Sequence, residues 1–293
     1  MKVLLTGAGG QLGWELQRTV PAGVAMVALG SRELDITDPK AVARVVADEG
    51  PAVIINAAAY TAVDRAEAES ERAFLVNAQG PAHLARAAQE GGARLIHLST
   101  DFLFDGLQST PYLPTDRPNP LGVYGRSKLA GEEEVLAISK GADTAIIRTA
   151  WVYSSHGHNF VKTMLRLMAE RDELGVICDQ VGTPTWARNL AQVVWSVVAS
   201  GLSGVHHCTD AGVASWYDFA MAIMEEAQAV GLLSRSPRIR PIPTTAYPLP
   251  ARRPPYSVLD KTSLWQALAL TPEHWRVALR KMLKEMGKEM VNG

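Results

Sequence analysis

Short runs of apolar and β-branched residues alternate with longer segments that carry apolar residues at helical spacing through the first half of the chain. Such an alternation is typical of a parallel sheet whose strands are buried on both faces by helices. Because crossovers between parallel strands are right-handed, the sheet is expected to be doubly wound. The predicted strands are residues 2–5, 25–29, 53–56, 94–99 and 144–148.

Beyond Trp151 the alternation becomes irregular. Helical patterns follow at residues 160–171, 188–199, 215–231 and from 271 to about 290. Seven prolines between Pro237 and Pro255 exclude a regular helix there and predict an extended, ordered loop. We therefore expect a Rossmann-type, doubly wound α/β domain over residues 1–150. A smaller mixed α/β region for substrate binding is expected over residues 151–293, with some segments returning to the first domain.

Composition and charge narrow the class of protein. The 29 Lys and Arg residues nearly balance the 30 Asp and Glu residues, so nothing favours nucleic acid or an anionic membrane as a partner. No apolar stretch is long enough to span a bilayer, and Met1 leads directly into the first predicted strand without a signal-peptide pattern. Cys178 and Cys208 form no CxxC pair and are expected to be reduced core thiols. We expect a cytoplasmic protein.

A glycine-rich turn connects the first predicted strand to the first helix. Its glycines permit a tight turn, a close approach of the backbone to a pyrophosphate, and close packing of helix on strand. Because the turn stands between a strand and a helix, a dinucleotide site is favoured over a mere glycine-rich loop. The predicted cofactor-binding residues of the turn are Gly7, Gly10, Gln11, Leu12 and Gly13.

The end of the second predicted strand bears on the choice of cofactor. Enzymes that use NAD commonly place an acid there to hold the ribose 2′-hydroxyl, whereas this strand ends Leu29-Gly30-Ser31-Arg32. Ser31 and Arg32 are candidates for holding a 2′-phosphate, which favours NADPH and leaves NADH as the alternative. A solvated loop position is the competing interpretation of Arg32. After the third strand, Ala58 and Ala59 leave room for a cofactor to pass close to the backbone.

Tyr124 and Lys128 are four residues apart at the start of a predicted helix and therefore lie on one helical face. A phenol has an ordinary pKa near ~10, and an adjacent ammonium lowers it toward the range useful for proton transfer. The spacing alone is frequent by chance. However, Ser99 and Thr100 end a buried strand that reaches the same carboxyl edge of the sheet. Tyr124, Lys128 and Thr100 are the predicted catalytic residues, with Thr100 or Ser99 bonded to a substrate carbonyl.

Four stretches of the chain resemble the extended short-chain dehydrogenase/reductase family: NAAAYTAVD at 56–64, STDFLFDG at 99–106, NPLGVYG at 119–125 and TTAYPLPARRP at 244–254. The resemblance covers essentially the whole chain. The last stretch is specific to a branch whose members reduce the C4 keto group of dTDP-4-dehydro-L-rhamnose to dTDP-L-rhamnose with NADPH or NADH. The resemblance therefore implies a reductase acting on a nucleotide-activated sugar.

The resemblance also implies roles for individual side chains. Tyr124 would donate the proton, Lys128 would tune the phenol and hold the nicotinamide ribose, and Thr100 would orient the keto oxygen. Asp35 and Ile36 resemble a pair that reads adenine in such enzymes. The further cofactor contacts implied by the resemblance are Tyr60, Thr61 and Ser99.

Substrate contacts follow from the same likeness. Asp101 and Trp151 would touch the sugar, although a core position is an alternative for the tryptophan. Arg252 and Arg253 would face the diphosphate, because guanidinium groups match phosphate oxygens in geometry. A solvated surface pair is the alternative for these two arginines.

Two positions depart from the family pattern. A tyrosine usually follows the Thr-Asp pair, but Phe102 stands there and lacks the hydroxyl. Some members bind magnesium through carboxylates at a dimer interface. Glu15 matches one of these, whereas residues 185–190 offer no acid where another is expected. No metal is therefore expected, and a homodimer is left open.

Rival functions share this fold. A second nucleotide-sugar 4-ketoreductase or an epimerase of the same family is the nearest alternative. Dehydratases of the family place Asp-Glu after the catalytic threonine, whereas Thr100 is followed by Asp101 and Phe102. A non-catalytic regulatory subunit would keep the fold, but such proteins usually lose the Tyr-Lys pair.

Overall fold

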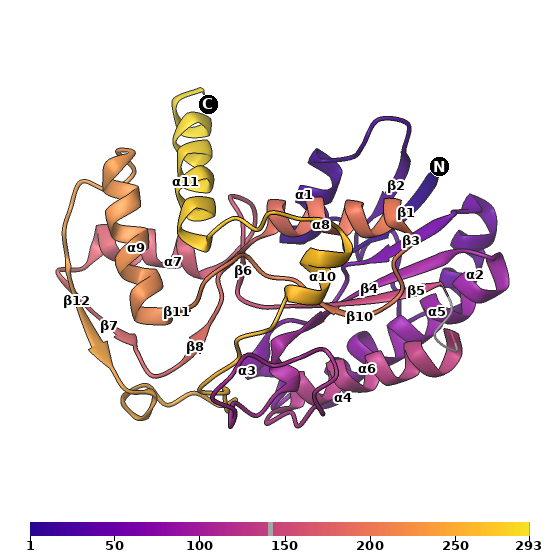
Figure 1. The fold of residues 1–293 in the computed structure, drawn as a ribbon, viewed down its shortest axis with the longest axis horizontal. Coiled ribbons are helices and arrows are strands. Elements are labelled where there is room, and N and C mark those ends of the chain that lie inside the picture. Colours follow the sequence, from indigo (N-terminus) through magenta and orange to yellow (C-terminus); the bar gives the residue numbers. More distant parts are fainter. Residues whose placement is uncertain (140–142, 293) are drawn as a thin grey trace.

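The computed structural model describes residues 1–139 and 143–292 and contains a six-stranded parallel sheet (Figure 1). The strands lie in the order β10-β5-β4-β3-β1-β2. All five strands expected in the first half are present to within about a residue at each end, and a sixth comes from the second half. The strands are β1 (Lys2–Thr6), β2 (Ala25–Leu29), β3 (Val53–Asn56), β4 (Arg94–Thr100), β5 (Thr144–Thr149) and β10 (Gly204–His207).

Helices cover both faces of this sheet (Figure 1). Side chains alternate along each strand, so Leu5 and Ile55 pack on one side while Leu4 and Ile54 pack on the other. The two layers are closed by α1 (Gln11–Arg18) and α8 (Ala187–Ser200) on the first face, and by α2 (Pro39–Glu49), α5 (Gly80–Gly91) and α6 (Val123–Ser139) on the second. This arrangement confirms the predicted doubly wound α/β class.

A second hydrophobic cluster lies beside the sheet, in the left half of Figure 1. It is built from α7 (Phe160–Glu170), α9 (Trp216–Ala229) and α11 (Trp275–Asn292), with the parallel pair β7 (Glu173–Ile177) and β12 (Arg238–Ile242). The helix α9 begins at a reciprocal cap, in which the Ser215 hydroxyl accepts from the Asp218 amide and the Asp218 carboxylate accepts from the Ser215 amide. The segments α8 and β10, although they come from the second half, belong to the sheet layer.

The remaining elements are short. They are α3 (Val63–Ala66), α4 (Ser70–Phe74), η1 (Leu75–Gln79), η2 (Asp101–Leu103), β6 (Val152–Tyr153), β8 (Val181–Gly182), β9 (Thr185–Trp186), β11 (Ala214–Ser215), η3 (Thr244–Ala246) and α10 (Thr262–Ala267). The proline-rich segment forms no α-helix, as expected. It begins as the strand β12, which the sequence analysis did not separate from the loop.

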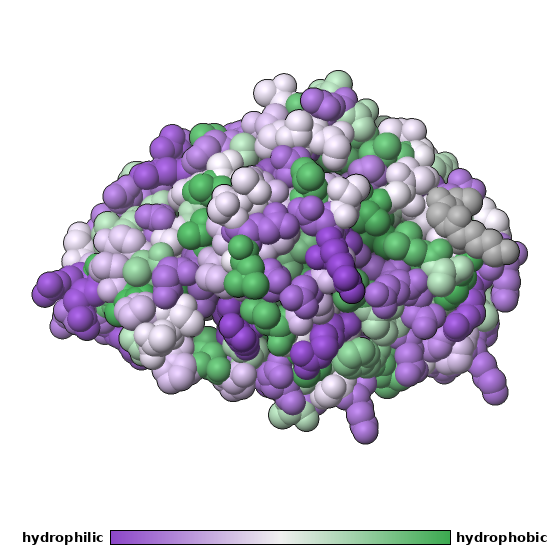
Figure 2. All heavy atoms as spheres, turned by 60° about the horizontal axis from the view of Figure 1, so that its bottom comes forward, coloured by the Kyte–Doolittle hydropathy of each residue, from purple (hydrophilic) through white to green (hydrophobic). Residues whose placement is uncertain are grey.

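The surface and the cysteines add two findings. Polar and hydrophobic residues are interspersed over the face seen in Figure 2. None of the helices in the described ranges has the length and apolar character needed to cross a membrane. Cys208 is buried, but Cys178 is exposed, so the expectation of two core thiols is wrong for Cys178. Its place just beyond the two-stranded β7–β12 sheet leaves it uncovered.

Candidate active site

The glycine turn after β1 lies against the end of β3. The strands β2 and β3 flank β1 on opposite sides, so the direction of winding reverses here. Gly7 has φ +76°, and a Cβ on it would stand 2.5 Å from the Ala58 nitrogen. A Cβ on Gly13 would stand 2.2 Å from the Gly7 oxygen. Both positions therefore exclude larger residues. In a doubly wound sheet, the crevice between strands that wind in opposite directions is where cofactors bind, and here it lies between β1 and β3.

The end of β2 holds both an exposed arginine and a carboxylate. Arg32 is exposed, and the Glu33 Oε2 atom accepts a hydrogen bond from the Gly30 amide at 2.9 Å. No acid was predicted at this strand end, because Glu33 lies three positions beyond Gly30 in the sequence and returns to it only through the turn. A little further on, the Thr37 amide and hydroxyl lower the pKa of Asp35.

Tyr60 is fixed by a residue that sequence analysis missed. The Asn77 side chain accepts from the Tyr60 amide at 2.8 Å, and its amide group donates to the Tyr60 oxygen at 3.0 Å and to the Ser127 hydroxyl at 3.0 Å. Asn77 lies in the π-helical turn η1, a distortion typical of functional sites. The nearby Gly131 is required because its Cβ would stand 2.0 Å from the Asn77 oxygen. No sequence spacing signals such a turn.

The first turn of α6 presents the Tyr124 side chain. The helix starts at Val123, whose amide donates to Glu67 Oε1 at 2.8 Å. A Cβ on Gly125 would stand 2.3 Å from the Phe102 oxygen, so a glycine is needed for α6 to lie this close to the end of β4. The Tyr124 ring meets the Phe102 ring edge-on, with centroids 5.5 Å apart.

The phenol of Tyr124 is held in its protonated form. Burial raises its pKa to about 12, the charge of Asp101 acts in the same direction, and a hydrogen bond with Thr100 opposes both. The expected lowering by Lys128 is not found. Instead, the Lys128 Nζ atom is fully buried and donates to the Leu98 oxygen at 2.7 Å. A raised pKa suits a group that must carry a proton at neutral pH.

Unsatisfied polar atoms gather where β4 and β5 end. Thr100 and Thr149 are directly paired in the sheet register. The Thr100 hydroxyl donates to Asp101 Oδ1 at 3.2 Å, and burial raises the pKa of Asp101 to about 6. In the described part of the chain, three buried oxygens of this edge lack hydrogen-bond partners: Ser99 Oγ, Asp101 Oδ2 and Thr149 Oγ1. Buried polar atoms are normally paired, so these atoms point to a polar ligand.

Trp151, two residues beyond the end of β5, has a backbone conformation rare for a bulky side chain. Its φ is +47°, and its ring stacks on that of Trp216 with centroids 3.5 Å apart. A Cβ on Gly182 would stand 2.6 Å from the Trp151 ring. Strain of this kind clusters at functional sites. The ring is half-buried and packs against the second cluster, so it is neither a pure core residue nor a free one.

The proline-rich loop and the end of β7 enclose a cavity of about 390 Å³. Arg252 lines it and is exposed. Arg253 also lines it, but its guanidinium is paired with Asp64 through contacts of 2.7 and 3.0 Å, and this pairing lowers the pKa of Asp64. The two arginines that the sequence grouped together therefore have different surroundings.

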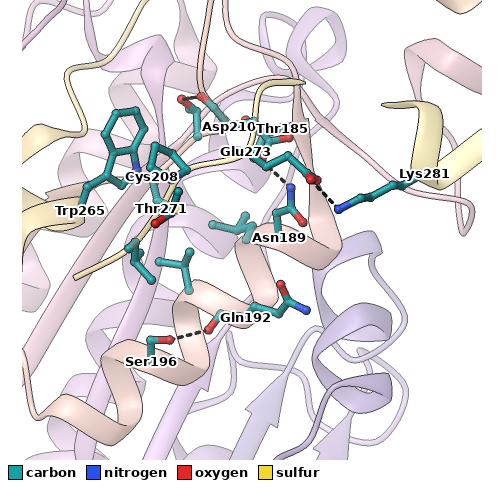
Figure 3. A pocket seen from close by; sticks show the side chains of 15 residues that line it. Thr185, Asn189, Gln192, Ser196, Cys208, Asp210, Trp265, Thr271, Glu273 and Lys281 are labelled. Atoms are coloured by element: carbon teal, nitrogen blue, oxygen red, sulfur yellow. Dashed lines mark hydrogen bonds and ion pairs between the residues drawn. The ribbon is translucent and has the colours of Figure 1, made fainter. Parts of the chain in front are cut away.

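Another cavity, of about 240 Å³, lies between α8, α10 and the start of α11 (Figure 3). Its buried carboxylate, Asp210, accepts from the Trp186 amide and from Asn189, and Glu273 is paired with Lys281. Both carboxylates here have hydrogen-bond or ion-pair partners, in contrast to the three unpaired oxygens at the ends of β4 and β5.

Glu15 does not fit a metal centre. Its carboxylate is fully buried and accepts from Arg188 Nε at 3.0 Å and from the Ser154 hydroxyl at 3.1 Å. Arg188 also pairs with Glu285. A guanidinium thus already neutralises this carboxylate. Among the side chains that the structure describes, which exclude residues 140–142 and 289–293, no group of three His, Cys, Asp or Glu residues is arranged to hold a metal ion.

A dinucleotide-type turn at a β1/β3 crevice, with a Tyr-x-x-x-Lys helix beside a Thr-ended strand, defines a short-chain dehydrogenase/reductase. The comparison with known families is more specific. The chain belongs to the family described as the RmlD substrate binding domain, whose model matches residues 1–288.

Relatives and solved structures agree with this family. The dTDP-4-dehydrorhamnose reductase of Burkholderia thailandensis is 43% identical over 299 residues, which cover 98% of this chain and 99% of that protein. The crystal structure of a dTDP-4-dehydrorhamnose reductase from Clostridium acetobutylicum has a TM-score of 0.92 and 39% identity, with both chains fully covered. That of the Bacillus anthracis enzyme, in complex with NADP, has a TM-score of 0.92 and 35% identity over 97% of this chain and 99% of that one.

Proposed function

We propose that this protein is an NAD(P)-dependent oxidoreductase that reduces the C4 keto group of dTDP-4-dehydro-L-rhamnose to dTDP-L-rhamnose. The observation that carries the proposal is the grouping of Tyr124 and Thr100 beside three unpaired buried oxygens at the edge where the glycine turn lies. Relatives that are 43% identical over nearly the whole chain carry this activity in their names.

In this proposal the side chains act on the keto oxygen. When bound, the reduced cofactor supplies the hydride. Tyr124 gives its proton to the developing alkoxide, which it can do because its phenol stays protonated at neutral pH. The Thr100 hydroxyl donates a hydrogen bond to the same oxygen. Asp101 and Trp151 bind the sugar, which is supported by the unpaired carboxylate oxygen and by the strained tryptophan.

NADPH is the proposed cofactor, with NADH as the second choice. Backbone amides of Gln11 and Leu12 bind the pyrophosphate at the start of α1, while the Gly10 amide holds the turn by donating to the Gly7 oxygen at 3.0 Å. Arg32 binds the 2′-phosphate. Lys128, together with Tyr124, holds the nicotinamide ribose. The binding of NADP by the Bacillus anthracis relative supports this choice. Ala58, Ala59, Tyr60, Thr61 and Ser99 are proposed as further cofactor contacts, and Asp35 and Ile36 as contacts to adenine.

A spectrophotometric assay tests the proposal. Purified protein is mixed with dTDP-4-dehydro-L-rhamnose and NADPH or NADH, and oxidation of the nicotinamide is followed together with the sugar product. Consumption of cofactor with formation of dTDP-L-rhamnose is expected, and Tyr124→Phe should abolish nearly all of it. Turnover with a different 4-keto sugar nucleotide only, or epimerisation without net cofactor consumption, would overturn the assignment.

A further inference from the structure

Three polar side chains lie in line across the sheet, just beneath the catalytic edge. Thr6, Asn56 and His97 are register partners on β1, β3 and β4. They point to the face covered by α6, one layer beyond the apolar row Leu4, Ile54 and Leu95. All three are buried, and the His97 ring is completely inaccessible. Buried polar groups of this kind persist only when their hydrogen bonds are satisfied.

The hydrogen bonds of this row fix the orientation of the Asn56 amide. The Ala58 backbone N–H, which only donates, points at Asn56 Oδ1 at 3.1 Å, and the Thr6 hydroxyl donates to the same oxygen at 2.8 Å. The Asn56 Nδ2 atom therefore faces His97 Nδ1, at 3.0 Å. An amide nitrogen donates and does not accept, so His97 Nδ1 must be the unprotonated nitrogen of the ring.

The proton of His97 consequently sits on Nε2. Burial, with Lys128 acting in the same direction, lowers the pKa of His97 well below its ordinary value, so the ring is neutral. The Nε2–H group points at the Lys128 Nζ atom, 3.5 Å away. An ammonium offers only donors, whereas a neutral amine offers a lone pair that accepts this N–H. The contact therefore favours the amine form of Lys128.

Other groups around Lys128 act beside this contact, and the Leu98 oxygen, which accepts from Nζ at 2.7 Å, serves the ammonium as well as the amine. Glu132, one turn further along α6, favours the ammonium, but Arg148 of β5 holds its carboxylate through contacts of 2.7 and 3.0 Å. Tyr124, on the same helix, is neutral because its pKa is raised. The carboxylate of Asp101, just after β4, is among the charges that raise the pKa of Tyr124. Burial lowers the pKa of Lys128 to about 8, so its charge changes within the working range of an enzyme.

We propose that His97 is a positioning residue that sets the protonation of Lys128, locked as the Nε2–H tautomer by Asn56. Its functional part rests on the proposed reductase activity. The same asparagine holds the Ala58 amide, against which Gly7 of the cofactor turn lies. One buried side chain thus links the geometry of the cofactor turn to the charge of the lysine beside Tyr124.

The tautomer is measured without any activity. Two-bond proton–nitrogen correlation spectra of the ¹⁵N-labelled protein distinguish the two ring nitrogens of each histidine, and the His97 signals are identified by their loss in His97→Asn or His97→Gln. A neutral ring with unprotonated Nδ1 and protonated Nε2, unchanged from pH 6 to 9, is expected. A proton on Nδ1, or on both nitrogens, overturns the proposal even if the protein is an active reductase.

The control over Lys128 is measured by the pH profile of kcat. His97→Asn keeps an acceptor for Asn56 but removes the N–H that favours the amine form of Lys128. The pKa of Lys128, and with it the basic limb of the profile, should therefore rise by about one pH unit, a tenfold change in the acid dissociation constant of the lysine. In His97→Gln, the longer amide side chain reaches toward Nζ, so the basic limb should rise by less than in His97→Asn. His206→Asn, on the edge strand β10 and half-buried, is the matched control and should leave the limb in place.

An unchanged basic limb in His97→Asn, with KM and kcat altered by a common factor, would reduce His97 to a packing role and overturn the proposal. Equal shifts in His97→Asn and His97→Gln would do the same, because water entering a cavity would then explain both. An inactive wild-type protein would instead reject the proposed function.

Discussion

The two ends of the candidate site are built in opposite ways. At the end that holds the proposed catalytic residues, Thr100 and Lys128 are buried on a strand and a helix of the sheet layer, and the surrounding protein shifts the pKa values of Tyr124 and Lys128. At the other end, Arg252 is an exposed side chain on a proline-rich loop. Proton transfer needs desolvated, fixed groups, whereas the capture of a charged ligand needs only a charge held on a stiff segment. We therefore expect changes at the buried end to act on kcat and changes at the exposed end to act on KM.

The largest effect is expected for Tyr124→Phe. Removing the phenolic proton should lower kcat by roughly 10²- to 10⁴-fold, the usual share of acid catalysis, with little change in cofactor affinity. Steady-state kinetics and a binding titration of NADPH measure the two quantities. Tyr217→Phe, on α9 and packed against the second cluster, is the control. Near-normal turnover of Tyr124→Phe would remove the distinction between the two ends.

A smaller effect is expected at the loop, where the two arginines should separate. Arg252→Ala should raise KM for the sugar nucleotide by about 10-fold, because a charge-assisted contact to a phosphate from a side chain held on a stiff, proline-rich segment contributes about 1.5 kcal/mol. Arg253→Ala should change KM only through the loss of the ion pair with Asp64, so Asp64→Asn should produce the same change in KM. The measurement is KM for both substrates in all three variants. Equal KM defects for Arg252→Ala and Asp64→Asn would contradict the separation.

The smallest effect is expected at the far end of the cofactor crevice. Arg32→Ala should lower kcat/KM for NADPH by about 5-fold while sparing NADH, because an exposed guanidinium contributes only about 1 kcal/mol. Arg44→Ala, exposed on α2, is the control. Equal use of both cofactors by the unaltered protein would contradict this prediction. The effect of Glu33, the carboxylate at the end of β2, would then be tested with Glu33→Gln.

Most of the fold could be predicted from the sequence, because its periods are local. Strand and helix spacing predicted five of the six sheet strands and the class, and a glycine turn between a strand and a helix predicted the crevice at Gly7. The sixth strand, β10, was not predicted because its residues, Gly204–His207, carry two histidines and no apolar run. The strand β12 was hidden by Pro241, which a sheet of only two strands tolerates.

The candidate site divides along the same line. Tyr124, Lys128 and Thr100 could be grouped from sequence, because the carboxyl ends of parallel strands always meet at one edge. Asn77, Glu33 and His97 could not, since each acts through a partner that only the folded chain brings near. From the sequence, Phe102 stood out only because it lacks the hydroxyl of a tyrosine. In the structure, its backbone carbonyl oxygen is the atom that requires a glycine at position 125.

Spacing along the chain was enough to predict which residue types stand at each strand end and helix start. The tertiary structure, in contrast, sets which of these groups are charged. Burial raises the pKa of Tyr124 and lowers that of Lys128, so the direction of each shift depends on the atoms packed around the group. It also decided that Arg253 is bound to Asp64 while Arg252 is open, because residues 64 and 253 become neighbours only through the fold. Spacing along the chain determines which side chains can come together at the site, and packing determines the electrostatic environment of each side chain there.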